Sequence, residues 1–245
     1  MTGLARIVRP EILDDLAPLD PRASRARRDL KRVHRAMGSI AILRRAVSGL
    51  MLTKPPQRIL ELGAGDGSLL LRLAQSIRPK WVGVELTLLD RVDLLSDADR
   101  EAYGRLDWKV SVKCVDVMTW AREISTPHYD LCIANLFLHH FDAAELVVLL
   151  PAIAMHADAF VACEPRRDRF SLLASHLIGI LGASAITRAD AVTSVIAGFK
   201  GSELRDIWPR TPDIWILEEF AARPFTHCFH GVRSRAGMGR PHERY

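Results

Sequence analysis

The sequence predicts an α/β fold: a doubly wound, mostly parallel seven-stranded sheet with an antiparallel C-terminal hairpin strand and an N-terminal helical cap. In segment 58–74, "RILELGAGDGSLLLRLA", an apolar stretch passes through a glycine-rich turn into helical spacing. Segments typical of buried strands then alternate with helical segments, which favours a parallel sheet. Two further strand-like segments, joined at "ARPF" (222–225), would add an antiparallel edge.

The region before the first strand is predicted to be helical from residue 21 to residue 52. Gly38 and Ser39 are expected to divide it in two, and "KPPQ" at 54–57 ends it. Its apolar side chains share one helical face. These are Leu30, Val33, Met37, Ile40, Leu43 and Val47.

The rest of the chain alternates between the two kinds of element. Strands are expected at 58–62, 80–85, 108–116, 129–137 and 158–165, before the C-terminal hairpin. Helices are expected near 67–77, 87–95, 142–156, 168–183 and 187–199. Three regions follow: a helical cap or lid over 1–53, a nucleotide-binding domain over 54–233 and a flexible basic tail over 234–245.

Composition indicates a cytoplasmic globular protein. The four cysteines show no C-x-x-C pattern and no spacing typical of a zinc site, so buried free thiols and no metal are expected. These are Cys114, Cys132, Cys163 and Cys228. The N-terminus does not read as a secretory leader, and no apolar run is long enough to predict a membrane span.

The net charge of +5 is concentrated near the N-terminus, where residues 22–45 hold nine Lys or Arg and one acid. A basic arm can contact nucleic acid or anionic lipid. A solvated helix face is the preferred interpretation. We expect this helix to cover an acceptor pocket, with nucleic acid disfavoured as a partner.

The glycine turn predicts a site for a nucleotide-like ligand. Gly63, Gly65 and Gly67 permit positive φ and a close approach of the backbone, and the following helix N-terminus favours polar or anionic groups. A dinucleotide fingerprint would need glycine at position 68, which is Ser68. The pattern is instead E-x-G-x-G-x-G, starting at Glu61.

This pattern resembles motif I of the class I S-adenosylmethionine-dependent methyltransferases. The resemblance covers residues 57–232, and small-molecule enzymes of the quinone and polyketide type are nearest. It implies a Rossmann-like domain that binds S-adenosylmethionine and releases S-adenosylhomocysteine. It also implies O- or C-methylation of a small, apolar or aromatic molecule.

The resemblance also implies which residues hold the cofactor. Glu85 follows the loop by about 20 residues, where an acid can bind ribose hydroxyls. Asp116 and its neighbours would lie beside the adenine, and Asn135 near the methionine portion. The full set is Glu61, Gly63, Ala64, Gly65, Gly67, Glu85, Leu86, Asp116, Val117, Asn135 and Leu136.

Several of these residues also have a purely structural interpretation. Glu61 can pair with a loop N–H, Asp66 can cap the following helix, Asp116 can be a turn residue, and Asn135 can satisfy the loop backbone.

His139 and His140 follow the fourth predicted strand and are the candidate catalytic residues. Ligands bind at this edge of open α/β sheets, and a histidine there can take the proton of a hydroxyl acceptor. The alternative is that each histidine only begins a helix or packs against its neighbours. Glu164, Arg166 and Arg167 end the fifth strand at the same edge, where they would position an anionic acceptor or form a solvated turn.

Sequence motifs also bear on three other functions. "ANLF" at 134–137 is unlike the N-P-P-Y or D-P-P-Y of enzymes that methylate exocyclic amines of bases, which disfavours that substrate class. A nicotinamide oxidoreductase is disfavoured by the glycine spacing and by the lack of a Tyr-x-x-x-Lys pair. A regulatory or scaffold protein that binds S-adenosylmethionine without turnover stays open.

Overall fold

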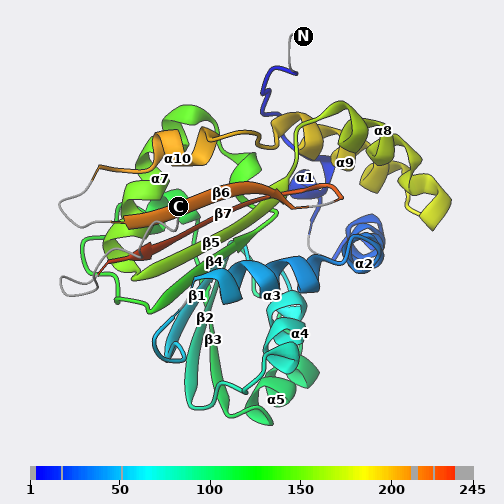
Figure 1. The fold of residues 1–245 in the computed structure, drawn as a ribbon. Helices are drawn as coiled ribbons and strands as arrows, with labels where there is room; N and C mark the ends of the chain where they lie inside the picture. Colours follow the sequence, from blue (N-terminus) through cyan, green and yellow to red (C-terminus); the bar gives the residue numbers. More distant parts are fainter. Residues whose placement is uncertain (1–3, 18, 51, 211–214, 223, 235–245) are drawn as a thin grey trace.

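The computed structural model describes residues 4–17, 19–50, 52–210, 215–222 and 224–234. It confirms the predicted fold class: seven strands form one sheet in the order β3-β2-β1-β4-β5-β7-β6 (Figure 1). The first five strands are parallel, and β7 runs antiparallel to both β5 and β6. The strands are β1 (Arg58–Leu62), β2 (Val84–Asp90), β3 (Trp108–Cys114), β4 (Leu131–Asn135), β5 (Ala159–Pro165), β6 (Trp215–Ala222) and β7 (Thr226–Arg233).

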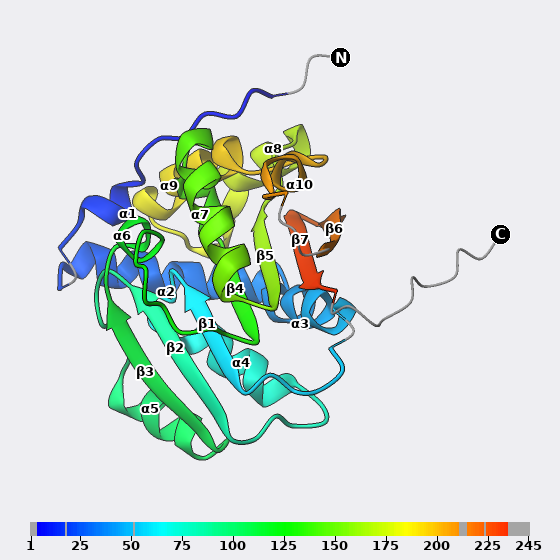
Figure 2. The ribbon, with the colours of Figure 1, turned by 90° about the vertical axis from the view of Figure 1, so that its left-hand side faces the viewer.

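Helices cover both faces of this sheet, with α3, α4 and α5 on one face and α6, α7 and α10 on the other (Figure 2). The helices are α1 (Ile12–Asp15), α2 (Pro21–Ala36), α3 (Ser39–Gly49), α4 (Ser68–Ser76), α5 (Asp97–Gly104), α6 (Val117–Trp120), α7 (Ala143–His156), α8 (Arg169–Leu177), α9 (Ala185–Ala197) and α10 (Glu203–Ile207), with the short 3-10 turns η1 (Leu138–His140) and η2 (Ile178–Leu181). None of them, within the part of the chain described, is long and apolar enough to cross a membrane.

The central strands are apolar because both of their faces are covered. Every residue of β5 is buried, and so are residues 131–134 of β4. Leu62 lies in register with Leu89 of β2 and with Ala134 of β4, and Asn135 lies in register with Cys163 of β5. The loops after β1, β2, β4 and β5 therefore emerge at one edge, which we call the carboxyl edge.

The second strand is where the predicted boundaries are wrong. The segment predicted to be a helix near 87–95 begins as strand, since β2 runs from Val84 to Asp90, and the next helix is α5. Leu86, Leu88 and Leu89 are buried on the two faces of the sheet. A short apolar run of this kind does not distinguish a strand from a buried helix.

The N-terminal region is helical and divides at Gly38, which has a φ of 69°, as predicted. Asp20 caps α2 and Pro21 occupies its first turn. Within α3, Leu43 and Val47 are buried, and the helix packs on β5 and β7. Helices α1, α2, α8 and α9 gather beyond the ends of the strands (Figures 1 and 2). Most of the predicted tail, from residue 235, lies outside the described residues.

Candidate functional site

The glycine loop joins β1 to α4 at the carboxyl edge. Gly63, Gly65 and Gly67 have φ values of 63°, 56° and 68°, which confirms the predicted left-handed conformation. A Cβ at Gly63 would overlap the ring of Phe137, and one at Gly67 would lie 2.8 Å from a methyl group of Leu88. Of these three glycines, only Gly65 would carry a Cβ that meets no atom within 4 Å. Packing therefore explains two of the glycines, and an approaching ligand has room at the third.

Asp90 ends β2 directly beside this opening. Its Oδ2 accepts a hydrogen bond from the Gly65 N–H at 2.8 Å, and its Oδ1 accepts one from Val92 at 3.2 Å. The carboxylate is partly exposed, so it offers acceptor oxygens to hydroxyl groups at the edge.

Glu85, which we predicted to end this strand, lies near its start, and that prediction is wrong. It is in register with Arg58 at the opposite end of β1, and the two exposed side chains pair at 3.8 Å. Leu86 is 1% exposed within the sheet. Because β2 continues five residues beyond Glu85, neither residue reaches the loop, and Asp90 takes the position we assigned to Glu85.

Glu61 is a buried carboxyl on β1 next to the loop, 3% exposed. Its Oε2 has no hydrogen-bond partner among the described residues. Burial, together with the negative charges of Asp66 and Asp90, raises the pKa of Glu61 well above its usual value. A cationic group placed here would relieve both conditions, because it would pair with the oxygen and favour the ionised form.

The remaining predicted cofactor residues follow their strands at the same edge. Asp116 is a helix cap and not the turn residue of its structural interpretation, since its carboxylate accepts hydrogen bonds from Met118 and Thr119 at the start of α6. Val117 is buried behind it. After β4, Leu136 adopts a φ of 51°, which is rare for leucine. That Asp116, Val117, Asn135 and Leu136 contact a ligand stays a prediction.

Asp66 both contributes to the helix start and binds the N-terminal region. Its carboxylate accepts a hydrogen bond from the Ser68 N–H at 3.1 Å and pairs with Lys31 of α2 at 2.6 Å. Burial raises the pKa of Asp66, but Lys31 and Ser68 lower it by more. Helix α2 thus contacts the glycine loop directly.

His139 lies between two carboxylates. Its Nδ1 is 2.8 Å from Oε2 of Glu164, and its Nε2 is 3.3 Å from Oε1 of Glu11. Glu164 is fully buried and also accepts hydrogen bonds from the backbone N–H groups of Phe137, Leu138 and His139. Burial lowers the pKa of His139, but the hydrogen bonds and charges of Glu11 and Glu164 raise it by more, to about 9. At neutral pH this histidine is a cation, with both of its nitrogens engaged.

His140 has a different environment. Its Nδ1 is 3.2 Å from Asp14 of α1, and its side chain is 24% exposed. Asp14 also pairs with Arg91, the residue after β2, at 3.5 Å. Helix α1 therefore reaches from the loop after β4 to the loop after β2. Glu11 and Asp14 were not predicted as site residues, because nothing in the local sequence relates them to a histidine pair more than a hundred residues away.

The charge on His139 predicts a pH dependence of stability. Its folded pKa of about 9 lies above the value of about 6.5 expected when unfolded. Its stabilising contribution is complete below pH 6.5 and is lost as the pH rises through 9. We expect the free energy of unfolding to fall across this window, and to fall less in His139→Gln. Urea titrations at several pH values measure this, and equal declines in both proteins would contradict it.

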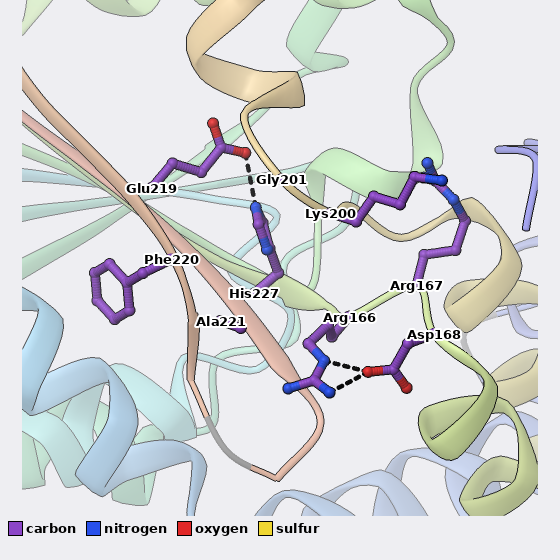
Figure 3. Close-up of a pocket in the computed structure, with 9 residues that line it drawn as sticks. All are labelled: Arg166, Arg167, Asp168, Lys200, Gly201, Glu219, Phe220, Ala221 and His227. Atoms are coloured by element: carbon purple, nitrogen blue, oxygen red, sulfur yellow. Dashed lines mark hydrogen bonds and ion pairs between the residues drawn. The ribbon is translucent and has the colours of Figure 1, made fainter. Parts of the chain in front are cut away.

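Acidic side chains pair with both arginines after β5, which we predicted to position an anionic acceptor or to form a solvated turn. Arg166 pairs with Asp168, and Arg167 is buried and pairs with Glu203. They line a cavity of about 330 Å³ with Lys200 and His227 (Figure 3). His227 is 2.7 Å from Glu219, and its buried Nδ1 has no partner in the described part of the chain. The neighbouring carboxylates offset the arginine charges, so this cavity is not a strongly cationic site.

No family model matches the chain. Two curated proteins share a segment with it, and both are named tRNA1(Val) (adenine(37)-N6)-methyltransferase. The one from Enterobacter sp. (strain 638) is 34% identical over 79 residues, and the one from Cronobacter sakazakii (strain ATCC BAA-894) is 33% identical over 84 residues. The match covers 32% of this chain and 31% of each relative, so the chain spans about a third of the relatives' length.

Solved structures resemble the chain over most of its length. The plantazolicin methyltransferase BpumL in complex with SAH has a TM-score of 0.60 at 14% identity, covering 88% of this chain and 92% of that one. BamL, in complex with a triazolic desmethylPZN analog and SAH, has a TM-score of 0.61 with the same identity and coverage. An O-methyltransferase family protein from Burkholderia thailandensis has a TM-score of 0.56 at 17% identity, covering 90% of this chain and 62% of that one.

Proposed function

We propose that this chain, whose fold is that of the class I S-adenosylmethionine-dependent methyltransferases, binds S-adenosylmethionine at the glycine loop and transfers its methyl group to a small acceptor. The observation that carries the proposal is that three features favourable to this ligand lie together at the glycine loop. Gly65 leaves open space, Asp90 offers a carboxylate beside it, and Glu61 holds a buried oxygen without a partner. These features fit a ligand with a ribose and an ammonium group.

Each part of the cofactor has a complementary residue. Asp90 would accept hydrogen bonds from the ribose hydroxyls, and Glu61 would pair with the ammonium of the methionine portion. Asp116 and Val117 would border the adenine, while Asn135 would lie along the methionine portion. The cofactor supplies an electrophilic methyl on a sulfonium centre, so the protein mainly has to align the acceptor with that methyl.

The acceptor is expected to be a small, apolar or aromatic molecule methylated on oxygen or carbon. Helices α1 and α2 lie over the carboxyl edge, where Asp14 contacts His140 and Lys31 contacts Asp66. We assign these N-terminal helices to a lid over the acceptor, as part of a cap over residues 1–53. For a hydroxyl acceptor, His140 is the better proton acceptor of the histidine pair, because Asp14 orients its ring and part of the side chain is exposed.

Cofactor binding is tested by S-adenosylhomocysteine titration. We expect the ligand to raise the melting temperature, because it binds the folded state. Asp90→Ala should weaken binding by about 1 to 3 kcal/mol, since the ribose hydroxyls lose their acceptor. Glu85→Ala is the matched control, because it removes an acid from the same strand at the opposite edge. Equal affinities of the parent and Asp90→Ala would refute the assignment of Asp90.

The curated relatives favour a second candidate function, methylation of a tRNA base. The sequence at the end of β4 argues against it, because residues 134–137 are "ANLF" and lack the two prolines of enzymes that methylate exocyclic amines. The basic residues of α2 would otherwise serve as a phosphate-binding surface. Two other functions, a non-catalytic S-adenosylmethionine-binding protein and a nicotinamide oxidoreductase, are separated by turnover and by NADH titration.

Binding of tRNA is expected to be weak. Fluorescence anisotropy with labelled tRNA at about 50 and 200 mM salt tests this, because each neutralised phosphate steepens the loss of affinity with salt. Tight binding with a steep salt slope, abolished by replacing the exposed arginines Arg25, Arg28 and Arg35 with serine, would overturn the lid assignment and favour the tRNA function.

A further inference from the structure

We propose that Glu11, His139 and His140 form a binding site for one divalent transition-metal ion at the carboxyl edge. Each of the three side chains offers one ligand atom, and these atoms all lie within 4.8 Å of one another. The site is enclosed, since His139 is buried and Glu11 and His140 are partly buried. Neither the fold nor the sequence pattern leads to this assignment, because Glu11 comes from the N-terminal segment.

The distances between the three ligand atoms suit one metal ion if the atoms move slightly closer together. Bonds of about 2.0 to 2.2 Å to nitrogen and oxygen imply donor separations of about 3 to 4 Å around one ion. Nε2 of His139 and Oε1 of Glu11 are already 3.3 Å apart. The rings of His139 and His140 lie 4.3 Å apart between centroids, so a shift of the partly exposed His140 ring would complete the set.

Hydrogen bonds from neighbouring residues hold the ligand side chains in place, as is usual at metal sites. A ligating histidine usually donates its other ring N–H to a carboxylate, which fixes the ring orientation. Glu164 has this role for Nδ1 of His139, and three backbone N–H groups hold Glu164 in turn. Ser194 of α9 similarly donates to Glu11. Nε2 of His139 is thereby directed at the proposed ion position.

The donor set selects the kind of ion. Two imidazoles and one carboxylate suit zinc, iron, cobalt or manganese, whereas magnesium and calcium prefer oxygen ligands. A bound ion would replace the proton that His139 otherwise shares with Glu11. Besides Glu164, which holds His139, Asp14 faces His140, and Arg91 in turn pairs with Asp14.

This inference rests on the proposed function for its chemical role. An ion at this edge would bind the oxygen of a hydroxyl acceptor and lower its pKa, so that the O–H proton leaves to water. The oxygen then forms a bond to the methyl carbon as the carbon–sulfur bond breaks, and S-adenosylhomocysteine leaves. In the metal-bound state the ion, and not the His140 ring, activates the acceptor.

Metal binding is measured without the cofactor, using tag-free protein stripped with a chelator. We expect Co²⁺ to bind at one ion per chain, with a visible absorption band of nitrogen and oxygen coordination, and Zn²⁺ to displace it. Glu11→Gln and His140→Ala should each weaken Co²⁺ binding by more than about tenfold, the lower end for changes behind a metal ligand. His176→Ala removes an exposed histidine on α8 and should leave binding unchanged.

Two results would overturn the proposal: the absence of stoichiometric Co²⁺ and Zn²⁺ binding, or binding that both variants retain. Circular dichroism of each variant separates lost binding from lost structure. S-adenosylhomocysteine titration of the stripped protein distinguishes the two proposals. Cofactor binding without metal binding refutes only the metal site, and metal binding without cofactor binding refutes only the methyltransferase function.

Discussion

Replacing Gly65 with leucine is expected to weaken S-adenosylhomocysteine binding by at least two orders of magnitude, about 2.7 kcal/mol, while the protein stays folded. Gly65 is the loop position where a side chain would project into open space, beside the carboxylate of Asp90. A leucine there would occupy the volume through which the ligand approaches the backbone. Calorimetric titration of parent and variant measures the loss.

A matched control addresses the strain of the substitution itself. Gly201 has a φ of 63° and also faces open space, but it lies between α9 and α10, away from the glycine loop. Gly201→Leu should therefore cost similar backbone strain and leave cofactor affinity unchanged. Leucine can adopt this conformation, since Leu136 does so natively with a φ of 51°. If Gly65→Leu and Gly201→Leu bind S-adenosylhomocysteine with comparable affinity, the cofactor does not bind at the glycine loop.

Much of the fold was predictable from local patterns, because parallel strands covered on both faces are continuously apolar and glycine marks the turn after β1. The error at β2 shows the limit of that reasoning. "VGVELTLLD" (82–90) contains two acids, and periodicity alone did not decide which of them ends the strand. Burial of Leu88 and Leu89 in the sheet settles it: β2 ends at Asp90, so Asp90 and not Glu85 lies beside the glycine loop.

The histidine site was predictable only in part. The position of His139 and His140 after a strand follows from the sequence, but the carboxylates from the N-terminal segment that pair with them do not. Glu11 and Asp14 lie beside the histidines because α1 is bound to α9. Asp190 of α9 accepts hydrogen bonds from the backbone N–H groups of Ile12 and Leu13 at 2.8 and 3.1 Å. That contact joins segments nearly 180 residues apart. Tertiary packing of this kind has no signature in a window of sequence.

The two histidines consequently differ in what their removal should do. His139 is a buried cation between Glu11 and Glu164, so removing it leaves the carboxylates on either side of the ring without their counter-charge. Such a change destabilises strongly. His140 is partly exposed, and its removal costs one ion pair, with Asp14, and ring contacts with Phe137 and His139. A loss of rate in a His140 variant therefore reports on chemistry more directly than one in a His139 variant.

Replacing His140 with alanine is expected to slow methyl transfer to a hydroxyl acceptor by about 10² to 10⁴-fold, the range for a positioned acid–base group. The affinity for S-adenosylhomocysteine should not change, because His140 lies after β4 and Glu61, Gly65 and Asp90 remain. A carbon acceptor that is already nucleophilic should be much less affected. Single-turnover transfer at saturating cofactor, with phenolic acceptors found by a turnover screen, measures the rate.

Rescue distinguishes the ways in which His140 can act. If the ring itself accepts the proton, added imidazole should restore part of the rate of His140→Ala in chelator-treated enzyme. If the ring acts by holding a metal ion, chelation should slow the parent enzyme as well, and the parent should recover on adding Zn²⁺ or Co²⁺. His176→Ala is again the control, on a helix that carries none of the assigned residues. A rate for His140→Ala within about threefold of the parent, below the lower end of the acid–base range, would remove both roles and leave alignment of the acceptor as the catalytic device.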